Sequence, residues 1–268
     1  MASLSKQNLN QSINVAIAIL LCTGAVVGLQ LPQLARLKNQ AKTASVADYQ
    51  KQVEAEKLQL QFLRKVPSFG FERLIADWAF INFLLYFGDD SARDKTGYSL
   101  SPEYFEIIVD RDPYFLRTYL FLSSSTTLYA GMPERSVALM NRGLKFLSPQ
   151  VPDKSYYIWR YKATDELLFL ADAQAARNSF IKAAEWANNY SDDESKYVAS
   201  ASSQTAKFLA TNPQSKAAQI SAWTTVLGNA FDNRTRRYAI SRIQALGGVV
   251  TISPQGELNI QVPKESGK

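Results

Sequence analysis

The chain has 268 residues, a hydrophobic content of 46% and a formal net charge of +6. This length suits one large or two small domains, and the composition is that of a folded chain. A single cysteine excludes an intramolecular disulfide framework, and the lack of histidine excludes Ser-His-Asp and Cys-His pairs and most zinc sites.

The basic excess lies near the N-terminus. Residues 1–66 contain eight basic and three acidic side chains, a balance of +5, whereas the remaining 22 basic and 21 acidic residues leave +1. Because nucleic-acid binding needs a concentrated basic face, we expect no nucleic-acid partner. We expect the basic segment to contact anionic lipid headgroups instead.

Residues 13–31 form a 19-residue stretch without charge. About 20 apolar residues cross a bilayer core, so residues 1–32 are predicted to be a short tail and one transmembrane helix. A cleaved signal peptide is an alternative, but only Lys6 provides positive charge before the stretch. A lipoprotein signal at Cys22 is a second alternative, but Leu21 stands where a small residue is expected. We therefore favour an uncleaved anchor.

The charges that flank this anchor bear on its orientation. Arg36, Lys38 and Lys42 follow it, whereas only Lys6 and the amino terminus precede it. The positive-inside rule therefore favours a cytoplasmic body.

Residues 33–66 are rich in Gln, Lys, Ala and Glu and are predicted to form a helical stalk, which Pro67 and Gly70 terminate. Its far end is apolar, and we expect that end to meet the folded body. The alternative is that this end is the first helix of the body. The apolar residues concerned are Leu58, Leu60, Phe62 and Leu63.

From residue 74 to residue 87 only Asp77 and Asn82 are strongly polar. Fourteen residues are too few to span a bilayer, so we favour a helix that is buried on all sides. The alternative is a helix that faces a partner or lies on the membrane. Asp89 and Asp90 follow, and we interpret them as solvated loop residues rather than metal ligands. The aromatic anchors of the alternative would be Trp78, Phe80, Phe83, Tyr86 and Phe87.

Residues 67–248 are predicted to form a domain of helices with marked ends. Asp112 and Pro113 indicate the cap and the first turn of one helix, and Ser191 and Glu194 indicate a capping box. Asp232 is predicted to cap the last helix, which ends at Gly247 and Gly248. The predicted helices are 113–130, 133–147, 154–170, 172–188, 192–210 and two more, one starting at Asn212-Pro213 and one after Asp232.

These helices form antiparallel pairs that begin near residues 113, 154 and 192. In the clearest unit Ala176, Phe180 and Ala183 alternate small, large and small, and Trp159 lies near the expected aromatic of the preceding helix. This unit resembles a tetratricopeptide repeat, which implies an all-α helical-repeat solenoid. HEAT-like pairs and an irregular helical domain are the alternatives. A weaker preceding unit contains Ser136, Met140 and Gly143.

Most of residues 70–190 also resemble uncharacterised, membrane-attached repeat proteins of bacteria, cyanobacteria among them. The resemblance rests on ADWAFINFLLYFGDD, DRDPYFLRTYLFLSS and GLKFLSP. It implies a single-pass protein of the plasma or thylakoid membrane that serves as a scaffold or assembly factor for a membrane complex, a photosynthetic one in cyanobacteria.

Residues 249–268 change in character, because two alternating segments, VVTIS and ELNIQV, flank a turn with Pro254 and Gly256. This pattern predicts a β-hairpin. Its edge could accept a partner strand, but we favour a cap that covers the last helix.

No phosphate-binding loop or dinucleotide fingerprint is present. The sequence therefore predicts no enzyme, no cofactor, no metal site and no catalytic residue. We predict a membrane-anchored scaffold that binds a protein partner, a subunit of a membrane complex. The alternatives are a stable accessory subunit, bound through residues 13–31 and 74–87, and an envelope enzyme that uses carboxylates. Binding residues are not assigned, because they depend on the curvature of the solenoid.

Overall fold

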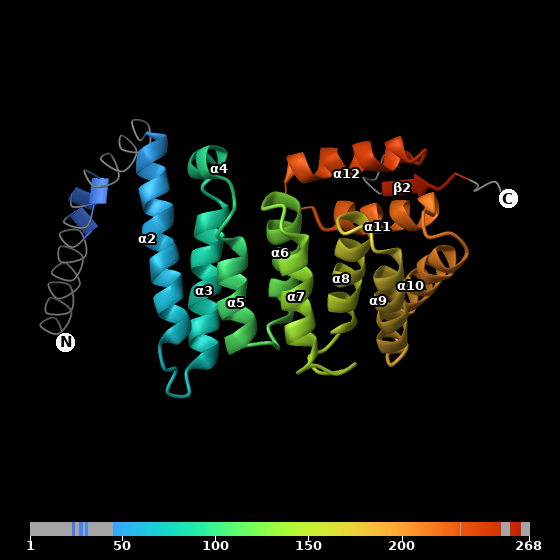
Figure 1. Ribbon diagram of the computed structural model, residues 1–268, viewed down its shortest axis with the longest axis horizontal. Helices are drawn as coiled ribbons and strands as arrows, with labels where there is room; N and C mark the ends of the chain where they lie inside the picture. The colour runs from blue at the N-terminus through green and yellow to red at the C-terminus, as the bar shows by residue number, and fades with distance from the viewer. Residues whose placement is uncertain are drawn as a thin grey trace, which may run out of the picture. The chain divides into compact units, whose positions relative to one another are not determined.

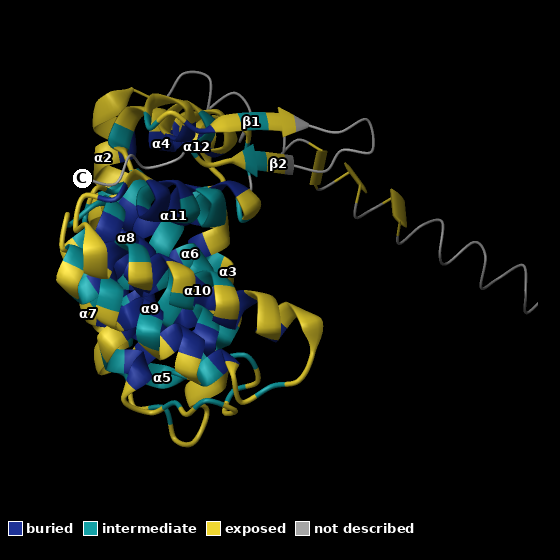
Figure 2. Cartoon of the chain, turned by 90° about the vertical axis from the view of Figure 1, so that its right-hand side faces the viewer, coloured by how far each residue is buried: buried dark blue, intermediate teal, exposed yellow. Residues whose placement is uncertain are grey.

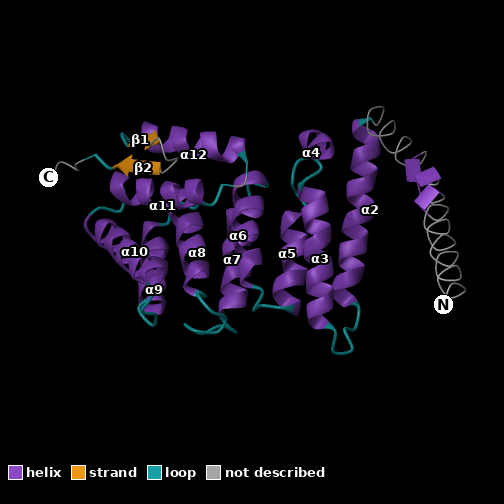
Figure 3. Ribbon diagram, turned by 180° about the vertical axis from the view of Figure 1, so that it is seen from behind, coloured by secondary structure: helices purple, strands orange, loops and turns teal. Residues whose placement is uncertain are grey.

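The computed structural model describes residues 45–230, 232–252 and 258–263, with three short helical pieces at 23–24, 27–28 and 30–31. Most of the predicted anchor at 13–31, and residues 33–44 of the predicted stalk, lie outside the described residues. No helix in the described part is both long and apolar enough to cross a bilayer. The described chain is mostly helical with one small two-stranded sheet, as the sequence predicts (Figures 1 and 3).

The chain divides into two compact units, residues 1–52 and residues 53–268. Helix α2 (Val46–Lys65) begins in the first unit and ends in the second. Within the second unit Leu60 is buried and Leu63 is partly buried in the core that α3 and α5 share, whereas Leu58 and Phe62 are exposed. Only part of the apolar end of α2 is therefore used for packing.

Helix α3 (Glu72–Phe87) corrects the expectation of a helix buried on all sides. Ala76, Ala79, Phe83 and Tyr86 are buried, and the opposite side of the helix faces solvent. Helix α5 (Ser101–Arg111) packs against the buried side and supplies Tyr104 and Phe105 to the same core.

The sequence analysis did not anticipate α5 or the short α4 (Asp90–Thr96) before it. Asp89 caps α4 by accepting a hydrogen bond from the backbone of Ala92. Asp89 and Asp90 are both exposed, as predicted, but they cap and begin α4 and do not lie in a loop.

The predicted helix 113–130 is really two segments of different kinds. Helix α6 (Leu116–Leu122) continues into a π-helix, η1 (Ser123–Tyr129), in which Ala130 donates to the carbonyl five residues earlier. The predicted start was wrong, because Asp112 is the C-cap of α5, where its backbone N–H donates to the carbonyl of Ile108. Helix α7 (Pro133–Leu144) begins with proline at its first turn, as predicted.

Helices α8 (Tyr156–Leu168), α9 (Ala173–Ala187) and α10 (Asp193–Thr211) pack in succession, with α9 between the other two. Ala176, Phe180 and Ala183 of α9 are buried, in keeping with their predicted packing role. The predicted capping box at Ser191 was wrong: Asp192 caps α10, and Glu194 pairs with Lys154 instead.

Helices α11 (Lys216–Gly228) and α12 (Asn233–Ala245) run across the ends of the upright helices (Figure 1). Ser215 caps α11, so this helix begins later than the predicted Asn212-Pro213. Asp232 caps α12, as predicted.

Strands β1 (Val249–Ile252) and β2 (Leu258–Gln261) form the predicted antiparallel hairpin, with Val249 opposite Gln261. Val250 and Ile260 pack against the cluster of α11 and α12 residues around Trp223. This contact supports the predicted capping role.

Most of helix α8 is buried (Figure 2). It contacts α6, α7, α9, α11 and η1. Polar side chains of α8 are consequently buried together with its apolar ones, and they include Lys162, Thr164, Asp165 and Glu166.

Candidate binding groove

A groove of about 660 Å³ lies within the second unit, between α8, α10, α11 and the end of β2. This volume is within the range that holds ligands in proteins. Its walls mix hydroxyl and amide groups, such as Ser200, Gln204 and Ser221, with the apolar side chains of Phe208 and Ile260. Such a lining suits a peptide segment better than a purely apolar ligand.

Arg160 of α8 is the one charged side chain among the described residues that line the groove. Its Nη2 donates to the Oγ1 of Thr225 on α11, 2.8 Å away, and its Nε is buried without a hydrogen-bond partner among the described residues. Burial lowers the pKa of the Arg160 guanidinium, although neighbouring tyrosines such as Tyr157 oppose the change. The groove therefore contains a partly buried positive charge.

A second polar cluster surrounds Tyr157, which also lines the groove. The Tyr157 hydroxyl donates to Glu194, and Lys154 forms an ion pair with the same carboxylate. Lys154 and Tyr157 together hold the pKa of Glu194 below its usual range. The cluster joins the start of α8 to the first turn of α10 and fixes the spacing of the groove walls.

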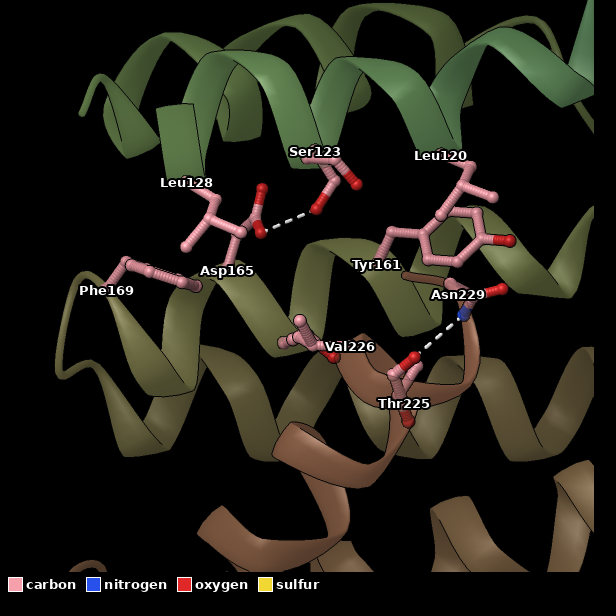
Figure 4. Close-up of a pocket in the computed structure, with 11 residues that line it drawn as sticks. Leu120, Ser123, Leu128, Tyr161, Asp165, Phe169, Thr225, Val226 and Asn229 are labelled. Carbon is pink, nitrogen blue, oxygen red and sulfur yellow. Dashed lines mark hydrogen bonds between the residues drawn. The ribbon is translucent and has the colours of Figure 1, made fainter. Parts of the chain in front are cut away.

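A separate cavity of about 30 Å³ adjoins the groove and shares Thr225 and Asn229 with it. It lies between η1, α8 and α11, where Asp165 and Ser123 face each other (Figure 4). It has room for about one or two water molecules but not for an organic substrate.

Asp165 is buried beside this cavity and accepts three hydrogen bonds of 2.7 Å, from Ser123, Thr127 and Ser136. Burial raises the pKa of Asp165 to about 6, although these three hydroxyls act in the opposite direction. They come from η1 and α7, so the carboxylate joins α8 to both elements. A π-helix turn places Ser123 and Thr127 on the same side of η1, toward Asp165.

A buried ion pair of α8 faces α9. The Nζ of Lys162 donates to the carboxylate of Glu166 at 2.5 Å and to the hydroxyl of Ser179 on α9 at 2.8 Å. The Ser179 hydroxyl in turn donates to Glu166 at 2.6 Å. All three polar groups are therefore satisfied by one another. This closed network joins α8 to α9 and leaves no group free for a ligand.

The exposed side of α3 is a second candidate surface. Leu74, Trp78, Ile81 and Leu85 form what we call the apolar stripe, with exposed fractions of 64%, 39%, 57% and 70%. Their spacing of four, three and four residues is that of a helix seam that packs against another helix. Of the predicted aromatic anchors, only Trp78 belongs to it. The others are buried or partly buried in the core: Phe80, Phe83, Tyr86 and Phe87.

The described residues contain no group of three or more acidic or cysteine side chains placed to hold a metal ion. Sequence reasoning did not identify Arg160. A usable signal was present, because α8 contains Arg160, Lys162, Asp165 and Glu166 within seven positions. Several charges on a helix that also has a strongly apolar neighbourhood indicate either buried networks or a ligand contact.

Comparisons of the chain with protein-family models, with curated proteins and with solved structures find no match. The resemblance to tetratricopeptide repeats stays a prediction, and the groove and the apolar stripe are the two candidate binding surfaces.

Proposed function

We propose that the protein is a membrane-anchored helical scaffold without enzymatic activity, which binds a segment of a partner protein in its groove. The observation that carries this proposal is the groove itself, with a mixed lining and a positive charge on one wall. The small cavity beside Asp165 holds only about one or two water molecules, so the proposal rests on the groove and not on this cavity.

In this proposal residues 13–31 anchor the protein and the basic residues that follow contact lipid headgroups. The partner is a subunit of a membrane complex or an intermediate of its assembly. A scaffold tied to the bilayer meets such partners at a high local concentration, so even a modest affinity for the groove suffices.

The apolar stripe on α3 favours a second candidate function, that of a stable accessory subunit. Contiguous exposed apolar residues mark interaction sites. In that case a helix of the partner covers Leu74, Trp78, Ile81 and Leu85 permanently, and the groove is not needed.

Site-specific photo-crosslinking in native membranes separates these two functions. A benzoylphenylalanine replaces Gln204 in the groove, Ile81 on the apolar stripe, or Lys182 on the exposed side of α9, which lines neither surface. A defined protein captured from Gln204 and not from Lys182 supports the groove scaffold. Capture from Ile81 alone supports the accessory subunit. Capture from neither position contradicts both.

The ratio of partner to scaffold after purification in mild detergent adds a second criterion. A near-unit ratio indicates an accessory subunit, and a lower ratio of precursor forms indicates an assembly factor. Recovery of the protein alone, under conditions that preserve other membrane complexes, would contradict the scaffold function.

A further inference from the structure

The guanidinium of Arg160 has no counter-ion in the described part of the chain. It forms none of the ion pairs there, and its single hydrogen bond goes to the neutral hydroxyl of Thr225. A charge that is partly removed from water costs free energy unless an opposite charge offsets it. The groove side of this side chain is where such a charge can reach it.

The acidic side chains of the neighbouring helices are already engaged elsewhere. Glu194 pairs with Lys154, Glu166 pairs with Lys162, and Asp165 accepts its three hydroxyl bonds from η1 and α7. None of the described residues that line the groove is acidic. The described part of the chain therefore supplies no counter-ion to Arg160, and a bound molecule can supply one.

Strand β2 provides the second observation. Ile260 of β2 and Val262 just after it line the groove, and in the described residues β2 pairs with β1 alone. Within the described residues, its other edge has no strand partner. An exposed strand edge of this kind binds extended peptides by adding a strand.

We propose that the groove holds an extended peptide segment that carries a carboxylate, which forms an ion pair with Arg160 while the backbone of the segment pairs with β2. The planar guanidinium is suited to this ligand, because a carboxylate accepts two parallel N–H bonds from it. The carboxylate belongs to an acidic side chain or to the end of the partner chain. This assignment rests on the proposed function, since it names the chemistry that the groove recognises.

The test uses the full chain in detergent micelles and a library of eight-residue peptides. Each sequence is present in three forms: with an internal Glu and an amidated end, with Gln in its place and an amidated end, and with Gln and a free carboxyl end. We expect at least one carboxylate form to bind about tenfold or more tightly than its neutral counterpart, and the two arms identify the source of the carboxylate. Methylating alternate backbone amides should abolish binding.

Two arginine variants complete the test. Arg160→Met should remove the preference for the carboxylate forms. Arg177→Met is the matched control, because Arg177 also has a buried Nε without a partner but lies on α9, outside the groove. It should keep the preference of the unaltered protein. The comparison of peptide forms on the unaltered protein tests the carboxylate preference of the groove even if Arg160→Met does not fold.

Equal binding of charged and neutral peptides would overturn the carboxylate assignment and leave the proposed function standing. A carboxylate preference that survives in a folded Arg160→Met variant would overturn the role of Arg160. No binding of any peptide, together with a protein captured from Gln204, would overturn the inference alone. If no protein is captured from Gln204, the result would instead count against the proposed function.

Discussion

The hydroxyl of Tyr129 donates a hydrogen bond to the carboxylate of Asp232, which lies 103 residues later in the sequence. Tyr129 is the last residue of η1, and Asp232 is the N-cap of α12, where it accepts a 2.8 Å bond from the backbone of Thr235. One carboxylate therefore caps a helix and ties that helix to the π-helix.

Removing either side chain of this contact should destabilise the protein, and the cost should be smaller when the partner side chain is already absent. Tyr129→Phe removes the hydrogen bonds of the Tyr129 hydroxyl with Asp232 and with the Thr235 hydroxyl, and should cost about 1–2 kcal/mol of unfolding free energy. Asp232→Ala also removes the cap and should cost about 1–2 kcal/mol more. A double-mutant cycle in chemical denaturation should give a coupling energy of about 1 kcal/mol.

Tyr197→Phe is the control for this cycle, because the Tyr197 side chain is 67% exposed. It should leave stability unchanged. Strict additivity of Tyr129→Phe and Asp232→Ala would mean that the contact does not contribute to stability.

The buried carboxyl of Asp165 predicts a particular dependence of stability on pH. Because burial raises its pKa to about 6, the folded protein binds this proton more tightly than the unfolded chain does. The contribution of Asp165 to the free energy of unfolding should therefore fall as pH rises from about 4 to about 6, and this loss should be complete above that range.

Asp165→Asn removes this titration. Relative to the unaltered protein, the variant should gain stability between about pH 4 and pH 6, by an amount on the order of 2–3 kcal/mol. Denaturation at a series of pH values measures the difference. Asp193→Asn, at an exposed position, should show no such trend. A constant difference between Asp165→Asn and the unaltered protein would mean that Asp165 has an ordinary pKa.

The network of Lys162, Glu166 and Ser179 should respond more strongly to the loss of one member than to the loss of all three. Lys162→Met leaves the Glu166 carboxylate buried without its partner and should cost about 3–5 kcal/mol. The triple variant Lys162→Met, Glu166→Met, Ser179→Ala replaces the network with apolar side chains and should recover most of that loss. Chemical denaturation measures both, and a triple variant less stable than the single one would contradict the explanation.

The close contact between α7 and Tyr119 leaves no room for a side chain at Gly143. A Cβ at this position would lie 2.7 Å from the Cζ of the Tyr119 ring, which is fully buried and donates to the carbonyl of Pro113. Gly143→Ala should therefore destabilise the protein by about 1–3 kcal/mol, because the ring has to move within a packed core.

Gly228→Ala is the matched control for this prediction. A Cβ at Gly228 of α11 meets no atom within 4 Å, and alanine favours helix, so this variant should be unchanged or slightly stabilised. Thermal unfolding of both variants checks the prediction. A similar unfolding temperature for the two would show that the core around Tyr119 accommodates a methyl group.

The success of the sequence predictions depends on how local each signal is. Asp232, Asp172 and Pro133 mark helix starts correctly, because a cap or a first-turn proline acts within one turn of backbone. The hairpin at 249–261 was also predictable from its alternation. The small residues at 176 and 183 are buried as their spacing suggested.

The failures concern features that only tertiary contacts decide. Both the apolar stripe and the buried side of α3 contain large apolar residues, so apolar character alone does not distinguish them, and packing against α5 decides which side is buried. The π-helix was missed since its extra residue is stabilised by Asp165 on another helix. Ser191 was chosen as a cap over Asp192 for the same reason: Glu194 is held by Lys154 rather than by its own turn. Arg160 was not identified because its distinguishing feature is the lack of an acidic partner in the described part of the chain, which only the folded structure can show.

The central position of α8 has a consequence for how binding can be observed. Its amide protons are covered by α6, α7, α9, α11 and η1, so they exchange with deuterated solvent only through openings that separate several helices at once. A ligand that contacts Arg160 stabilises the closed form against those openings. Occupancy of the groove should therefore slow deuterium uptake along the whole of α8, well beyond the residues that the ligand touches.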